Sequence, residues 1–255
     1  MRALIPMAGA GSRFSEAGYK IPKPLLPLLG EPMVVKAAQA LPVSDKYTFI
    51  VRDFQIKEYQ IDKHLKRYFP GCDVVELDHL TEGQAVTCLN AKNLFDLNEE
   101  LVIGASDNGM IYDHSKFNEA KKDADVIVFS FRNNPTVEEK PEAYGWVKTN
   151  SNGTEIEKMS VKVPISATPQ NDHAVVGAFW FRKSEFFIKA AERMIANNKR
   201  INNEFYVDEC INDALELGLK AKVFEIDHYV CWGTPTDYES FLYWEEYYKA
   251  ITANL

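Results

Sequence analysis

The chain has 255 residues, with 29 lysines and arginines against 37 aspartates and glutamates, which gives a formal net charge of −8. This length is ample for burying a sizeable core, and 46% hydrophobic with 26% charged residues is typical of a globular protein rather than a disordered one. The acidic balance argues against a general nucleic-acid coat protein but leaves room for a local basic pocket that binds phosphates.

The apolar runs and the cysteines indicate where in the cell the protein is expected. No apolar run approaches the roughly 18 residues that a membrane-spanning helix needs, so no membrane partner is expected. A secretory signal is not expected either, because Pro6 interrupts the few apolar residues before Ala8-Gly9-Ala10. The four cysteines are scattered (positions 72, 88, 210 and 231), which disfavours a disulfide framework or a four-cysteine zinc site and favours a cytoplasmic location.

Short β-rich runs alternate with helical patterns in the first half of the chain. The expected strands are Ala3–Ile5, Tyr47–Arg52, Asp73–Leu77, Leu101–Ala105 and Val126–Phe131. The expected helices are Met33–Leu41, Gln55–Tyr68, Gln84–Leu94 and one that begins after Asp113 as its N-cap. This alternation predicts a mainly parallel sheet with helices on both faces.

The pattern changes after Asn133. A β-hairpin is expected from Tyr144–Thr149 and Glu155–Lys162, joined by a turn at Asn152-Gly153. The later expected elements are a strand at Ala174–Phe181, helices at Glu185–Asn197 and Val207–Leu217, a strand at Lys222–Ile226 and a helix at Asp237–Ile251. The aromatic spacing of the last helix favours packing onto the body of the protein over a partner interface.

A loop rich in small residues follows the first strand. Ligands of open α/β sheets bind beyond the carboxyl ends of the strands. Small residues at positions 8 to 11 let the backbone approach a ligand closely, and exposed N–H groups there can cradle phosphates. The dinucleotide fingerprint is absent, because Phe14 stands where it needs glycine, and no Walker A loop is present. Alone, the loop is also compatible with an ordinary turn.

The same segment carries two cations. Arg13 follows the loop directly, and Lys23 lies between Pro22 and Pro24, which restrict the backbone on either side of it. A lone lysine is usually a solvated charge. At the end of a strand, however, such charges are what anionic oxygens require.

A second strand end carries Ser106 and Asp107. A carboxylate just beyond a buried strand is costly unless it is solvated, paired or bound to a metal. Asp107 is therefore a candidate Mg²⁺ ligand, since this ion prefers carboxylate and phosphate oxygens, and a turn or cap role is the alternative. Gly83 and Gln84 open a helix whose N-terminus could face a nucleotide or could simply be a cap.

Three segments in this order, Gly9–Arg13, Pro22–Leu25 and Gly30-Glu31-Pro32, resemble the signature loop of the nucleotidylyltransferase family, the sugar-1-phosphate and choline-phosphate activating enzymes. The resemblance extends over nearly the whole chain. It implies a three-layer αβα, mostly parallel Rossmann-like sheet of the glycosyltransferase-A-like type, with an inserted β-hairpin acceptor-binding region. It also implies one domain over residues 1–255, with a nucleotide-binding half at 1–132 and an acceptor-binding half at 133–255.

The resemblance also assigns roles to residues. Arg13 and Lys23 would contact the triphosphate and the transferred phosphoryl group, and Asp107 would bind Mg²⁺. The remaining nucleotide contacts would come from Ala8, Gly9, Ala10, Gly11, Ser12, Gly83, Gln84 and Ser106. The acceptor contacts would come from Tyr144, Gly145, Lys162, Gly177 and Glu204.

Two departures from the family pattern stand out. Val161 precedes Lys162 where relatives usually carry glutamate. Many relatives also have a second metal aspartate shortly before a Gly-Thr-Pro turn, but no carboxylate occupies that place before Gly233-Thr234-Pro235, and Asp227 is the nearest upstream acid.

The implied reaction is attack by an acceptor phosphate, most often a sugar 1-phosphate, on a nucleoside triphosphate with release of pyrophosphate. Because the second pKa of a phosphomonoester is near 6, this nucleophile is already ionised and needs no general base. The alternatives are a glycosyltransferase, although Gly109 stands where the Asp-x-Asp pair of such enzymes would need its second acid, and a non-catalytic nucleotide-binding relative. The base and the acceptor are not determined.

Overall fold

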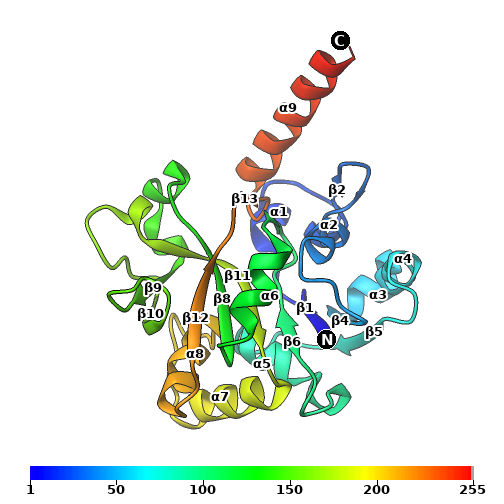
Figure 1. Ribbon diagram of the computed structural model, residues 1–255. Coiled ribbons are helices and arrows are strands. Elements are labelled where there is room, and N and C mark those ends of the chain that lie inside the picture. The colour runs from blue at the N-terminus through cyan, green and yellow to red at the C-terminus, as the bar shows by residue number, and fades with distance from the viewer. Residues whose placement is uncertain (254–255) are drawn as a thin grey trace.

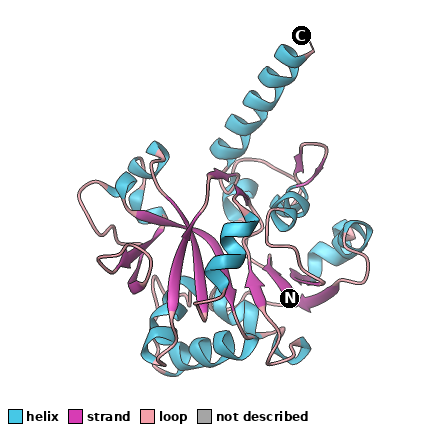
Figure 2. Ribbon diagram, in the orientation of Figure 1, coloured by secondary structure: helices cyan, strands magenta, loops and turns pink. Residues whose placement is uncertain are grey.

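The computed structural model describes residues 1–253 and has a central mixed sheet of nine strands. The strands run in the order β10-β9-β11-β6-β1-β4-β5, and β8 pairs with both β11 and β12. Figure 1 shows the course of the chain through these elements, and Figure 2 shows the strands at the centre with helices around them. This is the α/β arrangement that the sequence predicts.

The strands of the central sheet are β1 (Arg2–Pro6), β4 (Lys46–Arg52), β5 (Asp73–Leu77), β6 (Leu101–Ile103), β8 (Val126–Phe131), β9 (Gly145–Thr149), β10 (Ile156–Val161), β11 (His173–Phe181) and β12 (Ala221–Glu225). Two small ladders pair β2 (Pro27–Leu28) with β3 (Glu31–Pro32) and β7 (Asn108–Ile111) with β13 (His228–Cys231). The helices are α1 (Ser12–Glu16), α2 (Met33–Gln39), α3 (Asp53–Tyr59), α4 (Ile61–Tyr68), α5 (Gln84–Leu89), α6 (His114–Lys121), α7 (Ser184–Ala196), α8 (Val207–Glu216) and α9 (Pro235–Thr252). Short 3₁₀ turns cover Lys23–Leu25, Lys92–Leu94, Pro135–Glu138, Pro141–Ala143 and Pro169–Asn171.

Strand direction differs between the two halves of the chain. β1 is parallel to β4 and β6, and β5 is parallel to β4, as the alternation of strands and helices predicts. β11 instead runs antiparallel to β6, β8 and β9, and β9 and β10 form the antiparallel hairpin that precedes it in the chain. The carboxyl ends of β1, β4, β5 and β6 therefore share one edge of the sheet.

The alternation of side chains along the strands builds a core on each face of the sheet. On β1, Ala3 and Ile5 pack in one apolar cluster with helices α2, α4 and α6, whereas Leu4 packs in another with α5, α7 and α8. On β8, Ile127 and Val128 divide in the same way. Successive side chains of a strand point to opposite faces, so a strand buried on both faces is continuously apolar.

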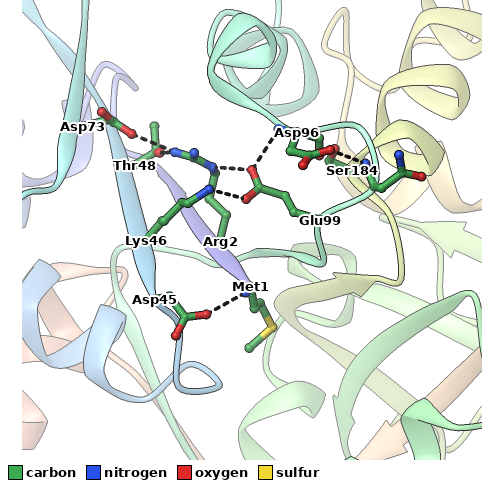
Figure 3. Close-up of polar contacts among 10 residues, drawn as sticks. Met1, Arg2, Asp45, Lys46, Thr48, Asp73, Asp96, Glu99 and Ser184 are labelled. Atoms are coloured by element: carbon green, nitrogen blue, oxygen red, sulfur yellow. Dashed lines mark hydrogen bonds and ion pairs between the residues drawn. The ribbon is translucent and has the colours of Figure 1, made fainter.

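A buried polar network closes the opposite edge of the sheet, away from the carboxyl ends (Figure 3). The Arg2 side chain is 6% exposed and donates to Glu99 at 2.8 Å, to Asp73 at 2.7 Å and to Thr48 at 2.8 Å. A buried guanidinium is tolerated when each of its donors has a partner. Lys46 adds a second cation to Glu99 at 3.1 Å, so the network joins three strand starts to the loop before β6.

Two helices differ from the sequence prediction. The helix expected over Gln55–Tyr68 is broken into α3 and α4, because Gln60 adopts a left-handed backbone conformation with φ of 51°. The prediction that the last helix packs onto the body is wrong for most of its length. Only Tyr238 of α9 is buried, and Figure 1 shows α9 extending away from the rest of the molecule to the C-terminal end.

The ladder of β7 and β13 was not expected from the sequence, and it brings two distant segments to the carboxyl edge. It pairs Asn108 with Cys231 in antiparallel register. The turn that follows begins α9, where Thr234 caps the helix by accepting from the N–H of Asp237 at 3.1 Å. Between residues 1 and 253, no helix combines the length and the apolar character that crossing a membrane requires.

Candidate functional site

The loops after β1 and β6 meet because these strands are parallel neighbours. The Lys23 ammonium donates to a carboxylate oxygen of Asp107 at 2.6 Å, and the two side chains are 21% and 25% exposed. Lys23 begins a 3₁₀ turn between two prolines, so its backbone is restrained where its side chain crosses to the other loop. The cation and the acid that the sequence singles out are thus in direct contact.

A cavity of about 510 Å³ opens above this contact. Its walls come from the loop after β1, the Lys23 loop, the start of α5, the loop after β6 and the segment before α8. Ten residues expected at the site line it: Ala8, Gly9, Ala10, Gly11, Lys23, Gly83, Gln84, Ser106, Asp107 and Glu204. The cavity is of the size that small-molecule sites occupy.

The loop from Met7 to Gly11 turns its backbone toward the cavity. Gly11 caps α1 with φ of 63°, a conformation that glycine adopts without strain. Across the described part of the chain, the N–H groups of residues 8 to 11 have no protein acceptor, whereas that of Met7 still bonds to Ile50 at 2.9 Å. No protein atom lies within 4 Å of the place where a Cβ on Gly9 would stand. Such a row of free N–H groups is suited to an anion.

The start of α5 is fixed by a segment far away in sequence. The N–H of Phe205 donates to Glu82 at 2.8 Å, and the N–H of Ala85 donates to Phe205 at 2.9 Å. A Cβ on Gly83 would lie 2.5 Å from the Phe205 nitrogen, so only glycine fits there. The N–H of Ala85 is one of the helix N–H groups that were expected to face a nucleotide, and it is now used within the protein. The two bonds also hold Glu204 beside the cavity.

The acceptor candidates gather at the open end of the β9–β10 hairpin. Lys162 donates from its backbone N–H to the carbonyl of Tyr144 at 3.1 Å, and its ammonium donates to the carbonyl of Ala143. The same ammonium lies 5.5 Å from the centre of the Tyr206 ring. Since Tyr206 lines the cavity, Lys162 stands just behind the cavity wall.

Several expected residues lie outside the cavity lining. These are Ser12, Arg13, Tyr144, Gly145, Lys162 and Gly177. Arg13 is exposed on α1, and its positive charge influences both Lys162 and Tyr206, so it lies on the acceptor side of the site. Lys23 thus lines the cavity, whereas Arg13 lies outside the lining and near Lys162 and Tyr206.

Gly177 has a structural explanation of its own. It has φ of 91° at an irregularity of β11, where the register shifts between Val175 and Phe179. Ala105 lies 3.5 Å from the position of its absent Cβ, and Asn108 donates to the carbonyl of Val176 at 2.7 Å. Gly177 thus supports the loop that carries Asp107.

Asp208 is an acid that the sequence analysis missed. Its carboxylate fills the space beside Gly145, where a Cβ would lie 2.1 Å from one carboxylate oxygen. Burial raises the pKa of Asp208 above its ordinary value, and the positive charge of Lys162 opposes this shift. Burial lowers the pKa of Lys162, and Asp208 partly offsets that effect. The attraction between the two charges therefore offsets only part of the cost of burying them.

Tyr206 is the second residue that the sequence analysis missed. It lies two residues after Glu204 at the N-cap of α8 and lines the cavity. Burial, with the nearby acids Glu204 and Asp208, raises the pKa of its hydroxyl, which stays protonated at neutral pH. The only available signal was its place beside Glu204 in the segment Glu204-Phe205-Tyr206.

The donors around Asp107 suit a single hard cation. Asp107 offers one carboxylate at the cavity with the Ser106 hydroxyl beside it, and Mg²⁺ is commonly held by one or two carboxylates plus substrate phosphates. Within residues 1–253, no group of three or more histidine, cysteine or acidic side chains could hold a metal by itself. A metal here would have to share its coordination with a phosphate ligand.

No carboxylate stands shortly before Gly233, where many relatives carry the second metal-binding aspartate. The space around Gly233 is occupied by other atoms. A Cβ on Gly233 would lie 2.9 Å from an Asp107 oxygen and 3.3 Å from the sulfur of Cys231. Burial raises the pKa of the Cys231 thiol to about 12, and the Asp107 charge adds to this, so the thiol is neutral at pH 7. Asp227 is exposed beyond the far end of β13 and cannot serve as the second acid.

Comparisons with known proteins agree with this geometry. The profile of the nucleotidyl transferase family matches residues 2–245. A nucleoside-diphosphate-sugar pyrophosphorylase from Vibrio cholerae RC9 is similar in structure with a TM-score of 0.77 at 22% identity, over 94% of this chain and 99% of that one. A UDP-glucose pyrophosphorylase in complex with UDP-glucose has a TM-score of 0.71 at 18% identity, over 98% of both chains.

An inositol-1-phosphate CTP transferase from T. maritima is also similar, with a TM-score of 0.68 at 15% identity, over 92% of this chain and 90% of that one. A search of curated protein sequences finds no significant match. At these identities the structural likenesses establish the fold, and the family profile establishes the family. Over nearly its whole length, the chain belongs to the nucleotidyl transferase family.

Proposed function

We propose that the protein transfers a nucleoside monophosphate from a nucleoside triphosphate to a small phosphorylated acceptor and releases pyrophosphate. The acceptor that we favour is a sugar 1-phosphate. The observation that carries this proposal is the Lys23–Asp107 contact in a cavity lined by free backbone N–H groups. The cation and the N–H groups suit a polyphosphate, and the acid suits the cation that accompanies a triphosphate.

For this reaction the protein would have to position the triphosphate and the acceptor phosphate and neutralise their negative charge. Mg²⁺ held by Asp107 would supply further positive charge at the phosphates when it is bound. Lys23 and the N–H groups of residues 8 to 11 would bind the triphosphate, and Arg13 would approach it from the acceptor side. Aligning two anions in line, and lowering their repulsion, is the main task in this type of phosphoryl transfer.

The acceptor would lie between the hairpin and α8. Lys162 would pair with the acceptor phosphate, and Tyr144, Gly145 and Glu204 would border its remainder. The phosphate oxygen is ionised at neutral pH and needs no base. Val161 is buried in the place where relatives usually carry glutamate, so one polar contact to a sugar would be absent.

The base would lie against Gly83 and Gln84 at the start of α5, both of which line the cavity. The N-terminal half, residues 1–132, would thus bind the nucleotide, and residues 133–255 would bind the acceptor. The similar structures include a CTP transferase and a complex with UDP-glucose. A role in nucleotide-sugar biosynthesis in the cytoplasm is consistent with this site.

The test is a pyrophosphate-release screen that crosses UTP, CTP, dTTP and GTP with a panel of phosphorylated metabolites in the presence of Mg²⁺. The proposal expects pyrophosphate together with a nucleotide-activated product for at least one pair. A glycosyltransferase would instead consume a finished nucleotide sugar and release no pyrophosphate. Nucleotide binding by calorimetry with no turnover on any acceptor would indicate a non-catalytic protein.

A further inference from the structure

In the part of the chain that the structure describes, the C-terminal helix α9 exposes large apolar side chains along one face. Its first turns are attached to the body, since Tyr238 is buried with Phe14 and Trp232 and donates to the carbonyl of Pro27 at 2.6 Å. Beyond Leu242 the helix continues to Thr252 and extends away from the molecule (Figure 1). The outer half of α9 is therefore a helix without support from the body.

Large apolar side chains form a stripe along this outer half. Tyr243, Tyr247 and Ile251 follow at intervals of four residues, as do Trp244 and Tyr248, so all five lie on one side of the helix. We call these five residues the aromatic stripe. Their exposed fractions are 64% for Tyr243, 51% for Trp244, 47% for Tyr247, 61% for Tyr248 and 40% for Ile251.

The helix itself needs a partner for physical reasons. Tyrosine and tryptophan are only moderate helix formers, and short helices without tertiary contacts are marginal in water. The aromatic rings contact one another, with centroids of Trp244 and Tyr247 5.6 Å apart, but these contacts leave the outer side of each ring in solvent. Burial of the stripe against another surface would stabilise both the helix and the rings.

We propose that the aromatic stripe is the contact surface between two copies of this chain. A buried aromatic side chain hides roughly 150–250 Å², so the four rings expose on the order of 300–550 Å² of ring surface. A stable interface takes about 800 Å² from each partner. The stripe thus supplies about half of one partner's share, and adjoining parts of α9 and the body would supply the rest.

The absence of charge on the stripe disfavours a partner of opposite charge and makes the stripe the part of α9 where two acidic copies can meet without repulsion. The stripe carries no charged residue, whereas the charged residues of α9 are Asp237, Glu239, Glu245, Glu246 and Lys249. Two copies with a net charge of −8 each repel one another over most of their surface. A two-fold contact through the stripe sets uncharged rings against rings, as a self-complementary interface requires. The acidic remainder of α9 also disfavours binding to an anionic membrane.

The experiment is sedimentation velocity of the full chain over a range of micromolar concentrations. The wild type is expected to be a dimer that dissociates on dilution, with a parallel loss of helical signal in far-UV circular dichroism. The variant with Trp244→Ser and Tyr248→Ser is expected to be a monomer that keeps the dispersed methyl signals of the folded body in a one-dimensional proton NMR spectrum. The matched variant with Glu246→Ser and Lys249→Ser alters the same helix away from the stripe and is expected to dimerise like the wild type.

Two results would overturn the proposal. A wild type that stays monomeric at every concentration would show that the stripe does not join two copies and is open to a different partner. A dimer that persists in the Trp244→Ser and Tyr248→Ser variant would place the interface elsewhere. Neither result bears on nucleotidyl transfer, since the stripe contains no residue of the cavity lining.

Discussion

The ammonium of Lys23 lies 2.6 Å from a carboxylate oxygen of Asp107, although 84 residues separate them in the sequence. The contact exists because β1 and β6 are adjacent parallel strands and the loops after them share one edge. In this contact each side chain neutralises the charge of the other. A bound triphosphate would offer Lys23 negative charge in place of Asp107, and its metal ion would offer Asp107 positive charge in place of Lys23. Both side chains therefore already stand where such a ligand would need them.

Removal of either member of this pair is expected to abolish most of the activity. For Lys23→Ala and Asp107→Ala, we expect turnover to fall on the order of 10²–10³-fold, the usual effect of losing one preorganised charged group. Pyrophosphate release measures this. The control is Lys92→Ala, which removes one side of a surface pair with Glu192 at 2.8 Å and should leave turnover unchanged. Near-normal turnover in both Lys23→Ala and Asp107→Ala would refute the assignment.

Two glycines of the cavity should respond differently to alanine. Gly83→Ala would bring a Cβ to 2.5 Å from the Phe205 nitrogen at a φ of 116°, and we expect it to destabilise the fold by roughly 1–3 kcal/mol. Gly9→Ala meets no protein atom within 4 Å and should leave the melting temperature unchanged. Because its methyl group would stand where the phosphates bind, Gly9→Ala should raise the KM for the triphosphate several-fold. An unchanged KM would place the triphosphate away from this loop.

Asp208→Asn is expected to raise the stability of the fold and to weaken binding of the acceptor. Because burial raises its pKa above the ordinary 3.8, the unfolded chain loses the proton more readily, and the charge destabilises the fold as the pH rises through the folded pKa. Asp208→Asn should therefore have a higher melting temperature than the wild type at pH 7, with a gap that shrinks toward pH 4.

The same substitution removes the negative charge that balances Lys162. We expect Asp208→Asn to raise the KM for the acceptor while the KM for the triphosphate stays the same. Asp227→Asn, at an exposed position far from the cavity, should change neither stability nor either KM. A melting temperature of Asp208→Asn below that of the wild type at pH 7 would contradict the account of the Lys162–Asp208 pair.

The Arg2 network predicts a pH-dependent loss of stability. Arg2→Leu removes the buried cation from Glu99, which keeps Lys46, and from Asp73, which is 44% exposed, and we expect a loss on the order of 1–3 kcal/mol in the free energy of unfolding. The side-chain bonds from Arg2 and Lys46 outweigh burial and lower the pKa of Glu99 below its ordinary 4.5.

A lowered pKa of an acid contributes stability above its ordinary value, and this contribution is lost as the pH falls through the folded pKa. The difference between wild type and Arg2→Leu in urea unfolding should therefore be largest near neutral pH and smaller below pH 4. Arg67→Leu, which changes an exposed arginine, should cost less than about 0.5 kcal/mol. Equal losses in the two variants would show that the network does not stabilise the fold.

Much of the fold follows from patterns within short segments. The strands Asp73–Leu77 and Val126–Phe131 were predicted to the residue. Val126–Phe131 is a nearly continuous apolar run that is buried throughout, as is typical of a strand covered on both faces, whereas Asp73–Leu77 is a short β-branched run at the edge of the sheet. Asp113 was predicted as an N-cap and accepts from the N–H of Ser115 at 2.8 Å. The break at Gln60 could not be predicted, since no glycine or proline marks it.

The candidate site was likewise predictable from the sequence only in part. The meeting of Lys23 with Asp107 could be predicted, because the carboxyl ends of parallel strands share an edge. The β7–β13 ladder could not, and neither could the contacts of Phe205 with Glu82 and Ala85, because they join segments that are far apart and carry no local signal. The aromatic spacing of α9 predicted an apolar face correctly, but not that the face points away from the body.

The central claim is that Lys23, Arg13 and Asp107 act on one bound triphosphate. The most direct measurement is a crystal structure of the protein with Mg²⁺ and a triphosphate whose α–β bridging oxygen is replaced by a methylene group. The account predicts that the triphosphate contacts the N–H groups of residues 8 to 11 and the Lys23 ammonium, with the metal ion on Asp107 and Arg13 turned toward the phosphates. A triphosphate bound elsewhere, with Lys23 and Asp107 still paired to each other, would contradict it.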